Sequence, residues 1–177
     1  MVKVFKLFGL MIFFILSLIF FMPKVNLYYK LEQVLQQQNI IISNEKLNDN
    51  GFNLEIKDAT VFFDSLESAK IEHLDISTLI LYQSLNIQNI KLSGIASSFI
   101  PISIENISIK HMIINPLNIT ISANGEFGTL NGSLHIIDKN LHITLKLSKQ
   151  MLKRYKKTLK YLEKNKNGDY NYDTIFN

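Results

Sequence analysis

The chain contains no cysteine among its 177 residues. A disulfide framework, a lipoprotein anchor and a thiolate metal site are therefore excluded. Arginine is nearly absent too, since Arg154 is the single example, whereas Ile, Asn and Lys are abundant. This bias is typical of an AT-rich bacterial genome, so the number of lysines carries little information about function.

Sequence motifs of the common enzyme classes are also missing. The chain has no Gly-x-Ser-x-Gly elbow, phosphate-binding loop, His-Glu-x-x-His motif or dinucleotide-binding glycine pattern. Its carboxylates are scattered singly, and Asp58 and Asp64 have no neighbour with which they could divide acid and base roles. We therefore expect no catalytic residues, no cofactor and a protein that is not an enzyme.

The longest apolar run lies near the N-terminus. Lys3 and Lys6 precede sixteen uncharged, almost wholly apolar residues from Leu7 to Met22. A membrane-spanning helix needs about 20 apolar residues, with roughly 17 as the lower bound. Residues 1–5 extend the run into this range, because the stem of a lysine can lie along an apolar surface while its amine reaches water.

This segment has the layout of a signal peptide or a membrane anchor, in which a positive flank precedes an apolar run. The exit from Ile19 to Pro23 is bulky at the positions where a signal peptidase requires small residues. We therefore expect residues 1–23 to form an uncleaved, single-pass anchor in the bacterial inner membrane. Residues 24–177 would then lie in the periplasm.

Beyond the anchor, the hydrophobic period first indicates a helix. Leu27, Leu31, Val34 and Leu35 lie on one helical face, which predicts a short amphipathic helix over Asn26–Gln38. The alternative is that this segment continues the anchor helix across a proline kink.

From residue 51 the period changes to two. Apolar and polar residues alternate in several segments, for example Leu117–Ser122 and Leu141–Ser148, which predicts antiparallel strands with one buried and one wetter face. Asn124-Gly125 and Asn131-Gly132 predict hairpin turns, since both residue types tolerate positive φ. Residues 24–148 are therefore expected to form a curved, one-sided antiparallel sheet that runs as a meander after the short helix.

The last hairpin of this sheet has a predicted register. A two-residue loop at Lys139-Asn140 pairs Ile136 with Ile143 and keeps the apolar residues on one face. His135 and His142 then lie diagonally across the hairpin on one face. A transition-metal site would still need a third ligand, so we favour solvated histidines and predict no metal site.

Positive charge is concentrated near the C-terminus. Residues 23–145 carry a net charge of −4, whereas residues 146–166 carry +8. Residues 149–177 are expected to form a basic amphipathic helix and a tail. The apolar stripe of this helix consists of Leu152, Tyr155, Leu159 and Leu162. Its basic residues are Lys153, Arg154, Lys156, Lys157 and Lys160.

These basic residues are candidate contacts with a membrane or a partner, and the helix has three interpretations. The apolar stripe could cover the end of the sheet and leave the basic residues to solvent. The helix could also lie on an anionic membrane surface. Nucleic-acid binding ranks last, because one arginine and no base-stacking platform accompany the lysines. No nucleic-acid partner is therefore expected.

A family resemblance rests on three features of residues 1–147. They are the anchor with Pro23, the short helix Asn26–Gln38, and the segment Gly51–Ala59 that opens a series of Ile-rich strands. In this layout the chain resembles the type II secretion protein N family and the wider group of AsmA-like envelope proteins. The resemblance implies a mainly β fold, in which an inner-membrane anchor carries a curved antiparallel sheet in the periplasm, and it brings no catalytic residues.

The resemblance implies a non-enzymatic, membrane-anchored periplasmic component of an envelope transport or secretion apparatus. The lipopolysaccharide-transport bridge protein C has a similar plan, which gives lipid or lipopolysaccharide transfer as the alternative. The expected partners are the inner membrane, other transport or secretion proteins and, in the alternative, lipid. The apolar face would then be a groove lined by residues such as Ile104, Ile119, Ile143 and Leu145, although alternation looks the same for a closed core.

Overall fold

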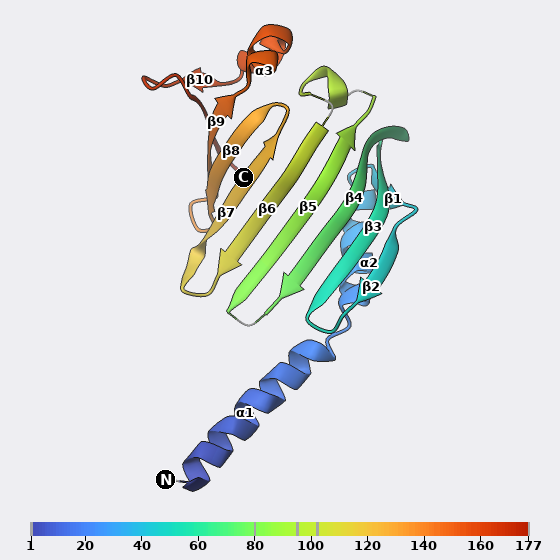
Figure 1. The fold of residues 1–177 in the computed structure, drawn as a ribbon, viewed down its shortest axis with the longest axis vertical. Helices are drawn as coiled ribbons and strands as arrows, with labels where there is room; N and C mark the ends of the chain where they lie inside the picture. The colour runs from blue at the N-terminus through green and yellow to red at the C-terminus, as the bar shows by residue number, and fades with distance from the viewer. Residues whose placement is uncertain (1, 80, 95, 102, 177) are drawn as a thin grey trace.

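The computed structural model describes residues 2–79, 81–94, 96–101 and 103–176, in which two helices precede a single antiparallel sheet (Figure 1). Helix α1 spans Val2–Phe20 and helix α2 spans Lys24–Gln36. The chain leaves the helical conformation at residues 21–23, so α2 is a helix of its own and not a kinked continuation of α1. Within the described residues, α1 is the one helix long and apolar enough to cross a membrane.

The sheet has eleven strands in the order β1-β3-β4-β5-β6-β7-β8-β9-β11-β10, with β2 also paired to β3. It is open, and from β3 to β9 it is a meander, as predicted. The strands are β1 Ile40–Ser43, β2 Lys46–Asp49, β3 Asn53–Phe63, β4 Leu66–Thr78, β5 Tyr82–Leu92, β6 Ser103–Met112, β7 Asn115–Gly125, β8 Gly128–His135, β9 Asn140–Leu147, β10 Glu163–Lys164 and β11 Tyr170–Ile175.

The register gathers apolar side chains on one face, because successive side chains of a strand point to opposite faces. One row of paired residues contains Leu54, Ile76, Leu85, Ile109, Ile121, Gly132, Ile143 and Tyr172. The neighbouring row on the other face contains Glu55, Asp75, Asn86, Ser108, Ser122, Asn131, Thr144 and Asn171. The sheet is therefore one-sided, which confirms the predicted fold class.

A line of locally unpaired residues crosses β3, β4, β5 and β6. Each strand has two apolar residues three positions apart, namely Ile56 and Ala59, Ile71 and Leu74, Ile87 and Ile90, and Ile104 and Ile107. An interval of three would change faces in a regular strand. The ladder skips Asp58 and Asn89, which have φ of 59° and 54° and are residue types that tolerate this conformation. Both apolar residues of each strand nevertheless pack in the clusters of the apolar face.

The buried residues form two clusters at different places on the apolar face. Beneath α2, Tyr28 packs with Leu54, Ile56 and Ala59. The second cluster lies toward the opposite end of the strands and consists of Ala69, Ile90, Ile104, Phe127 and Met151.

Neither of the two Asn-Gly pairs forms the predicted turn. Asn131-Gly132 lies inside β8, where a Cβ on Gly132 would come within 3.0 Å of the His142 backbone oxygen. This glycine permits close approach of β9 instead of forming a turn. The turn between β7 and β8 is residues 126–127, directly after the predicted Asn124-Gly125.

The connection between β8 and β9 is residues 136–139, not the predicted two-residue loop. Leu134 therefore pairs with Leu141, and His135 pairs with Asn140. The observed register differs from the predicted one by four residues. Because a slip of four keeps every side chain on its face, the alternation alone does not distinguish the two registers.

The basic segment is helical in two short pieces, α3 over Lys149–Arg154 and α4 over Lys156–Leu159. Ser148 begins α3 by accepting a hydrogen bond from the Met151 amide at 3.1 Å. Tyr155 interrupts the helix, with φ −108° and ψ 41°. The chain then returns to the sheet, where β11 pairs with β9.

Candidate functional site

The apolar face of the sheet is covered unevenly. Helix α2 packs against β1, β2 and β3, and in Figure 1 it lies behind these strands. Away from α2, Leu85, Ile109, Ile121, Ile143 and Leu145 are only half-buried, although they occupy inner strands. This part of the face is open and apolar, so it can bind an apolar ligand or a partner surface.

Two hollows lie on this face. A hollow of about 170 Å³ separates α2 from the sheet and is lined by Tyr28, Leu31, Leu54 and Ile76, among others. A second hollow, of about 270 Å³, is lined by Ile76, Leu85, Ile109 and Ile119 and by the polar residues Ser77, Thr78, Gln83, Ser84 and His111. Both are lined by Ile76 and Thr78, so the two hollows are neighbours, and we call them together the depression between α2 and β7.

The buried residues of α2 are not the ones that the sequence predicted. Leu27, Leu31 and Val34 are exposed, whereas Lys24 and Tyr28 are buried. The Tyr28 hydroxyl has no hydrogen-bond partner among the described residues, and burial, with smaller contributions from Glu45 and Glu32, raises its pKa above the usual range. The space between α2 and the sheet is therefore of low polarity.

The four predicted groove residues occupy two environments. Ile119 lines the larger hollow, and Ile143 and Leu145 lie half-buried on β9 on the same face. Ile104 belongs to the closed cluster around Phe127 and Met151.

The predicted basic residues are all exposed. They lie on α3, on α4 and directly after α4, at the end of the sheet opposite α1 (Figure 1). The apolar stripe predicted for this segment is displaced by one residue at its start, since Met151 is 1% exposed and Leu152 is 38% exposed.

The two histidines of the β8–β9 hairpin contact different acids. His135 Nδ1 lies 2.7 Å from Asp138 Oδ2, and His142 Nδ1 lies 2.5 Å from Asp173 Oδ1. Among the residues that the structure describes, no three His, Asp or Glu side chains form a group that could hold a metal ion.

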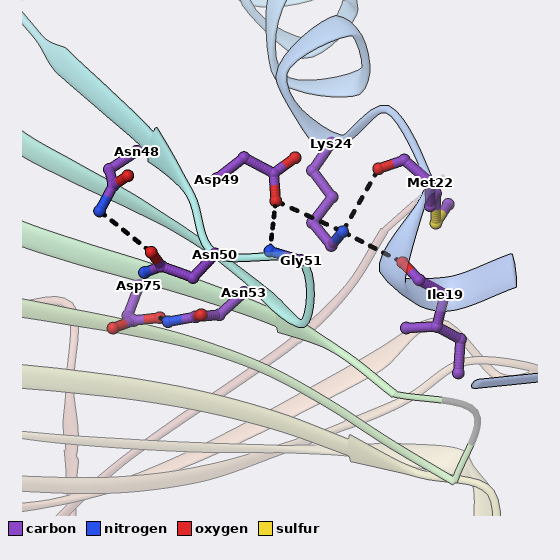
Figure 2. A network of polar contacts seen from close by, with 9 residues as sticks. All are labelled: Ile19, Met22, Lys24, Asn48, Asp49, Asn50, Gly51, Asn53 and Asp75. Carbon is purple, nitrogen blue, oxygen red and sulfur yellow. Dashed lines mark hydrogen bonds and ion pairs between the residues drawn. The ribbon is translucent and has the colours of Figure 1, made fainter. Parts of the chain in front are cut away.

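A buried lysine joins α1, α2 and the β2–β3 turn (Figure 2). The Lys24 side chain is 5% exposed, and its Nζ donates to the backbone oxygens of Ile19 at 3.1 Å and Met22 at 3.3 Å. The Asp49 carboxylate lies 3.5 Å from the same nitrogen and accepts the Gly51 amide at 2.8 Å. The last carbonyls of a helix lack intrahelical partners and attract positive charge. Lys24 therefore caps α1 and ties it to the sheet.

The aromatic end of α1 packs on the same turn. Gly51 has φ +82°, and a Cβ there would lie 2.2 Å from the Phe20 ring. The Phe20 ring also meets the Phe52 ring edge-on, with centroids 5.4 Å apart. These contacts and the Lys24 network hold α1 in a defined direction relative to the sheet.

Sequence reasoning did not identify this junction. Its signals are a lysine one residue after the proline that closes the apolar run, and the turn sequence Asp49-Asn50-Gly51. The two signals lie about 25 residues apart, and nothing in the alternation pattern connects them.

Comparison of the chain with known protein families, with curated protein sequences and with solved structures gave no match.

Proposed function

We propose that this chain is a non-enzymatic, membrane-anchored component of an envelope transport or secretion apparatus. In this proposal α1 spans the bacterial inner membrane and the sheet lies in the periplasm. The observation that carries it is the open apolar part of the sheet, joined through Lys24 and Asp49 to a helix long enough to span a membrane. The resemblance of the layout to the type II secretion protein N family supports the same proposal.

An open apolar face on a one-sided sheet is suited to binding. Soluble monomers rarely expose large contiguous apolar surfaces, and those that do usually use them for interaction. The opposite face is formed by Asn, Ser, Thr and charged residues, which suit contact with water. The apolar face is thus the side on which we expect a partner of the apparatus to bind.

Lipid or lipopolysaccharide transfer is the second candidate function. It is favoured by the depression between α2 and β7, because its lining combines aliphatic side chains such as Leu54, Leu85 and Ile109 with polar ones, and because Thr78 and Gln83 place it at the α1 end of β4 and β5. A lipid leaving the membrane around α1 would meet this part of the sheet first.

Site-specific photocrosslinking in cells distinguishes these functions. A benzophenone amino acid at Ile119 or Ile143 would face the open apolar surface, and the same group at Thr120 or Thr144 would face the other side. We expect crosslinks from the Ile positions only. A protein adduct would support the transport or secretion component, and a lipid adduct would support transfer. Equal crosslinking from both faces would contradict both functions.

The topology is tested separately with reporters fused to the C-terminus. A reporter that is active only in the periplasm should give signal. Signal from a reporter that works only in the cytoplasm would contradict the anchored orientation.

A further inference from the structure

The end of the sheet from which α1 departs carries exposed apolar side chains in successive turns. We call this end the anchor-side rim; it comprises the described residues of the β2–β3, β4–β5, β6–β7 and β8–β9 turns and the end of β11. Its most prominent residues include Leu81, Ile113, Ile114, Ile137, Ile175 and Phe176. Ile114 is 89% exposed, so the fold itself gives no reason for these residues to be apolar.

The anchor-side rim is one continuous edge. Backbone hydrogen bonds connect its turns, from Ile113 N to Leu81 O at 3.1 Å, from Ile136 N to Leu117 O at 2.8 Å, and from Phe176 N to Lys139 O at 3.0 Å. At its other end, the β2–β3 turn contacts α1 through Phe52 and Phe20. The apolar surface therefore extends from the end of α1 to the last strand.

Charge is sparse on this rim. Asp138 and Lys139 lie in the β8–β9 turn, and Asp49 is paired with the buried Lys24. The opposite end of the sheet also exposes apolar residues, such as Leu66, but it carries Asp64 and Ser65 beside them and the basic helices α3 and α4. The anchor-side rim is thus mostly apolar, whereas the opposite end of the sheet is also charged.

We infer that the anchor-side rim lies in the interface of the bilayer that α1 spans; this inference rests on the anchor of the proposed function. The Lys24 junction fixes α1 against the rim, and Figure 1 shows α1 running obliquely below this edge of the sheet. The turns are therefore held near the level at which α1 leaves the membrane. Apolar side chains can enter the boundary between headgroups and acyl chains to a depth of roughly 5–10 Å.

Lipid is the occupant that these observations select. The rim is continuous with the apolar surface of α1, and its backbone groups in the turns are hydrogen-bonded to neighbouring turns. The second contact with the membrane would stop the sheet from tilting about α1. It would also hold the depression that contains Thr78 and Ile119 close to the lipid surface.

Single tryptophans can test this contact, because the chain contains none. The full-length chain would be reconstituted in phosphatidylethanolamine and phosphatidylglycerol vesicles with brominated acyl chains, which quench nearby tryptophan. Ile113→Trp probes the rim at 51% exposure, and Leu66→Trp probes the opposite end at 52%. Phe13→Trp probes α1. We expect loss of fluorescence and a blue shift for Phe13→Trp and Ile113→Trp, and neither for Leu66→Trp.

The outcomes separate the two proposals. One outcome is that Phe13→Trp is quenched but Ile113→Trp is quenched no more than Leu66→Trp. This outcome would overturn the rim contact and leave the anchor in place. Absence of quenching at Phe13 would overturn the anchor and the rim contact together. Circular dichroism checks that each variant is folded. If Ile113→Trp is not folded, Ile137→Trp in the β8–β9 turn tests the same contact and is read in the same way.

Discussion

Lys24 stabilises the junction between α1 and the sheet with one amine in a nearly water-free position. Lys24→Met keeps much of the side-chain volume but leaves the carbonyls of Ile19 and Met22 without this donor. Leaving buried polar groups unsatisfied costs about 1–3 kcal/mol, so the free energy of unfolding should fall by that amount in a denaturant titration in detergent.

The matched control for this substitution is Lys46→Met. Lys46 also has an acidic partner, Asp58 at 2.8 Å, but both side chains are largely exposed. Exposed ion pairs contribute little to stability, so this variant should unfold almost like the parent chain. Equal losses for the two lysine variants would show that the buried position of Lys24 is unimportant.

Gly51 permits the close approach of Phe20 to the β2–β3 turn. Gly51→Ala places a residue with a Cβ at a positive φ, and this Cβ would overlap the Phe20 ring. Gly168→Ala has a similar φ of +89°, but its Cβ would meet only open space. The backbone strain, about 1–2 kcal/mol, is common to both variants. Gly51→Ala should therefore lower the melting temperature by clearly more than Gly168→Ala. The same shift in both variants would mean that Phe20 moves aside at no cost.

At the scale of elements, α3 covers the end of the sheet through Met151 and not through Leu152. Met151→Ala should reduce the free energy of unfolding by about 2–5 kcal/mol, as expected when a buried side chain is truncated. Leu152→Ala should reduce it less, because Leu152 is already 38% exposed whereas Met151 is 1% exposed. Chemical denaturation of both variants measures this difference, and a larger loss for Leu152→Ala would contradict the packing of α3.

The position of α3 shows where helical periodicity fails. The stripe of Leu152, Tyr155, Leu159 and Leu162 requires about three continuous helical turns. The helix is interrupted at Tyr155, and α3 buries Met151 against the sheet instead. This packing depends on residues far away in the sequence, such as Phe127 and Ile104, so a local pattern does not reveal it.

The strand elements were predictable as a class, but the details of their pairing were not. The alternation of apolar and polar residues predicted the one-sided meander, because one face of the sheet is apolar and the other is polar. The β8–β9 register was missed because a slip of four residues preserves that alternation. The positive-φ residues Asp58 and Asn89 do leave a sequence signal, namely apolar residues three apart in neighbouring strands, which an expectation of strict alternation overlooks.

At the scale of the whole molecule, the sequence predicted an apolar face but not which part of it is open. Ile56 and Ile143 lie on the same face and have the same side chain. Ile56 is 1% exposed beneath α2, whereas Ile143 is half-buried on β9. The difference arises because α2 packs chiefly against the first three strands and does not cover β9. That packing depends on Lys24 and Tyr28, which lie outside the apolar stripe that sequence periodicity indicated for this helix.

This difference gives a direct test of the open face. Ile56→Asp places a carboxylate in a closed apolar cluster, where an unpaired charge is strongly destabilising, so the loss should exceed about 4 kcal/mol and prevent stable folding. Ile143→Asp places the same carboxylate where water can reach it, so the sheet should form with a far smaller loss of stability. Circular dichroism and urea unfolding of the full-length chain in detergent measure both. If Ile143→Asp is as damaging as Ile56→Asp, the face around Ile143 is closed in solution, and the binding surface on which the proposed function rests is not available.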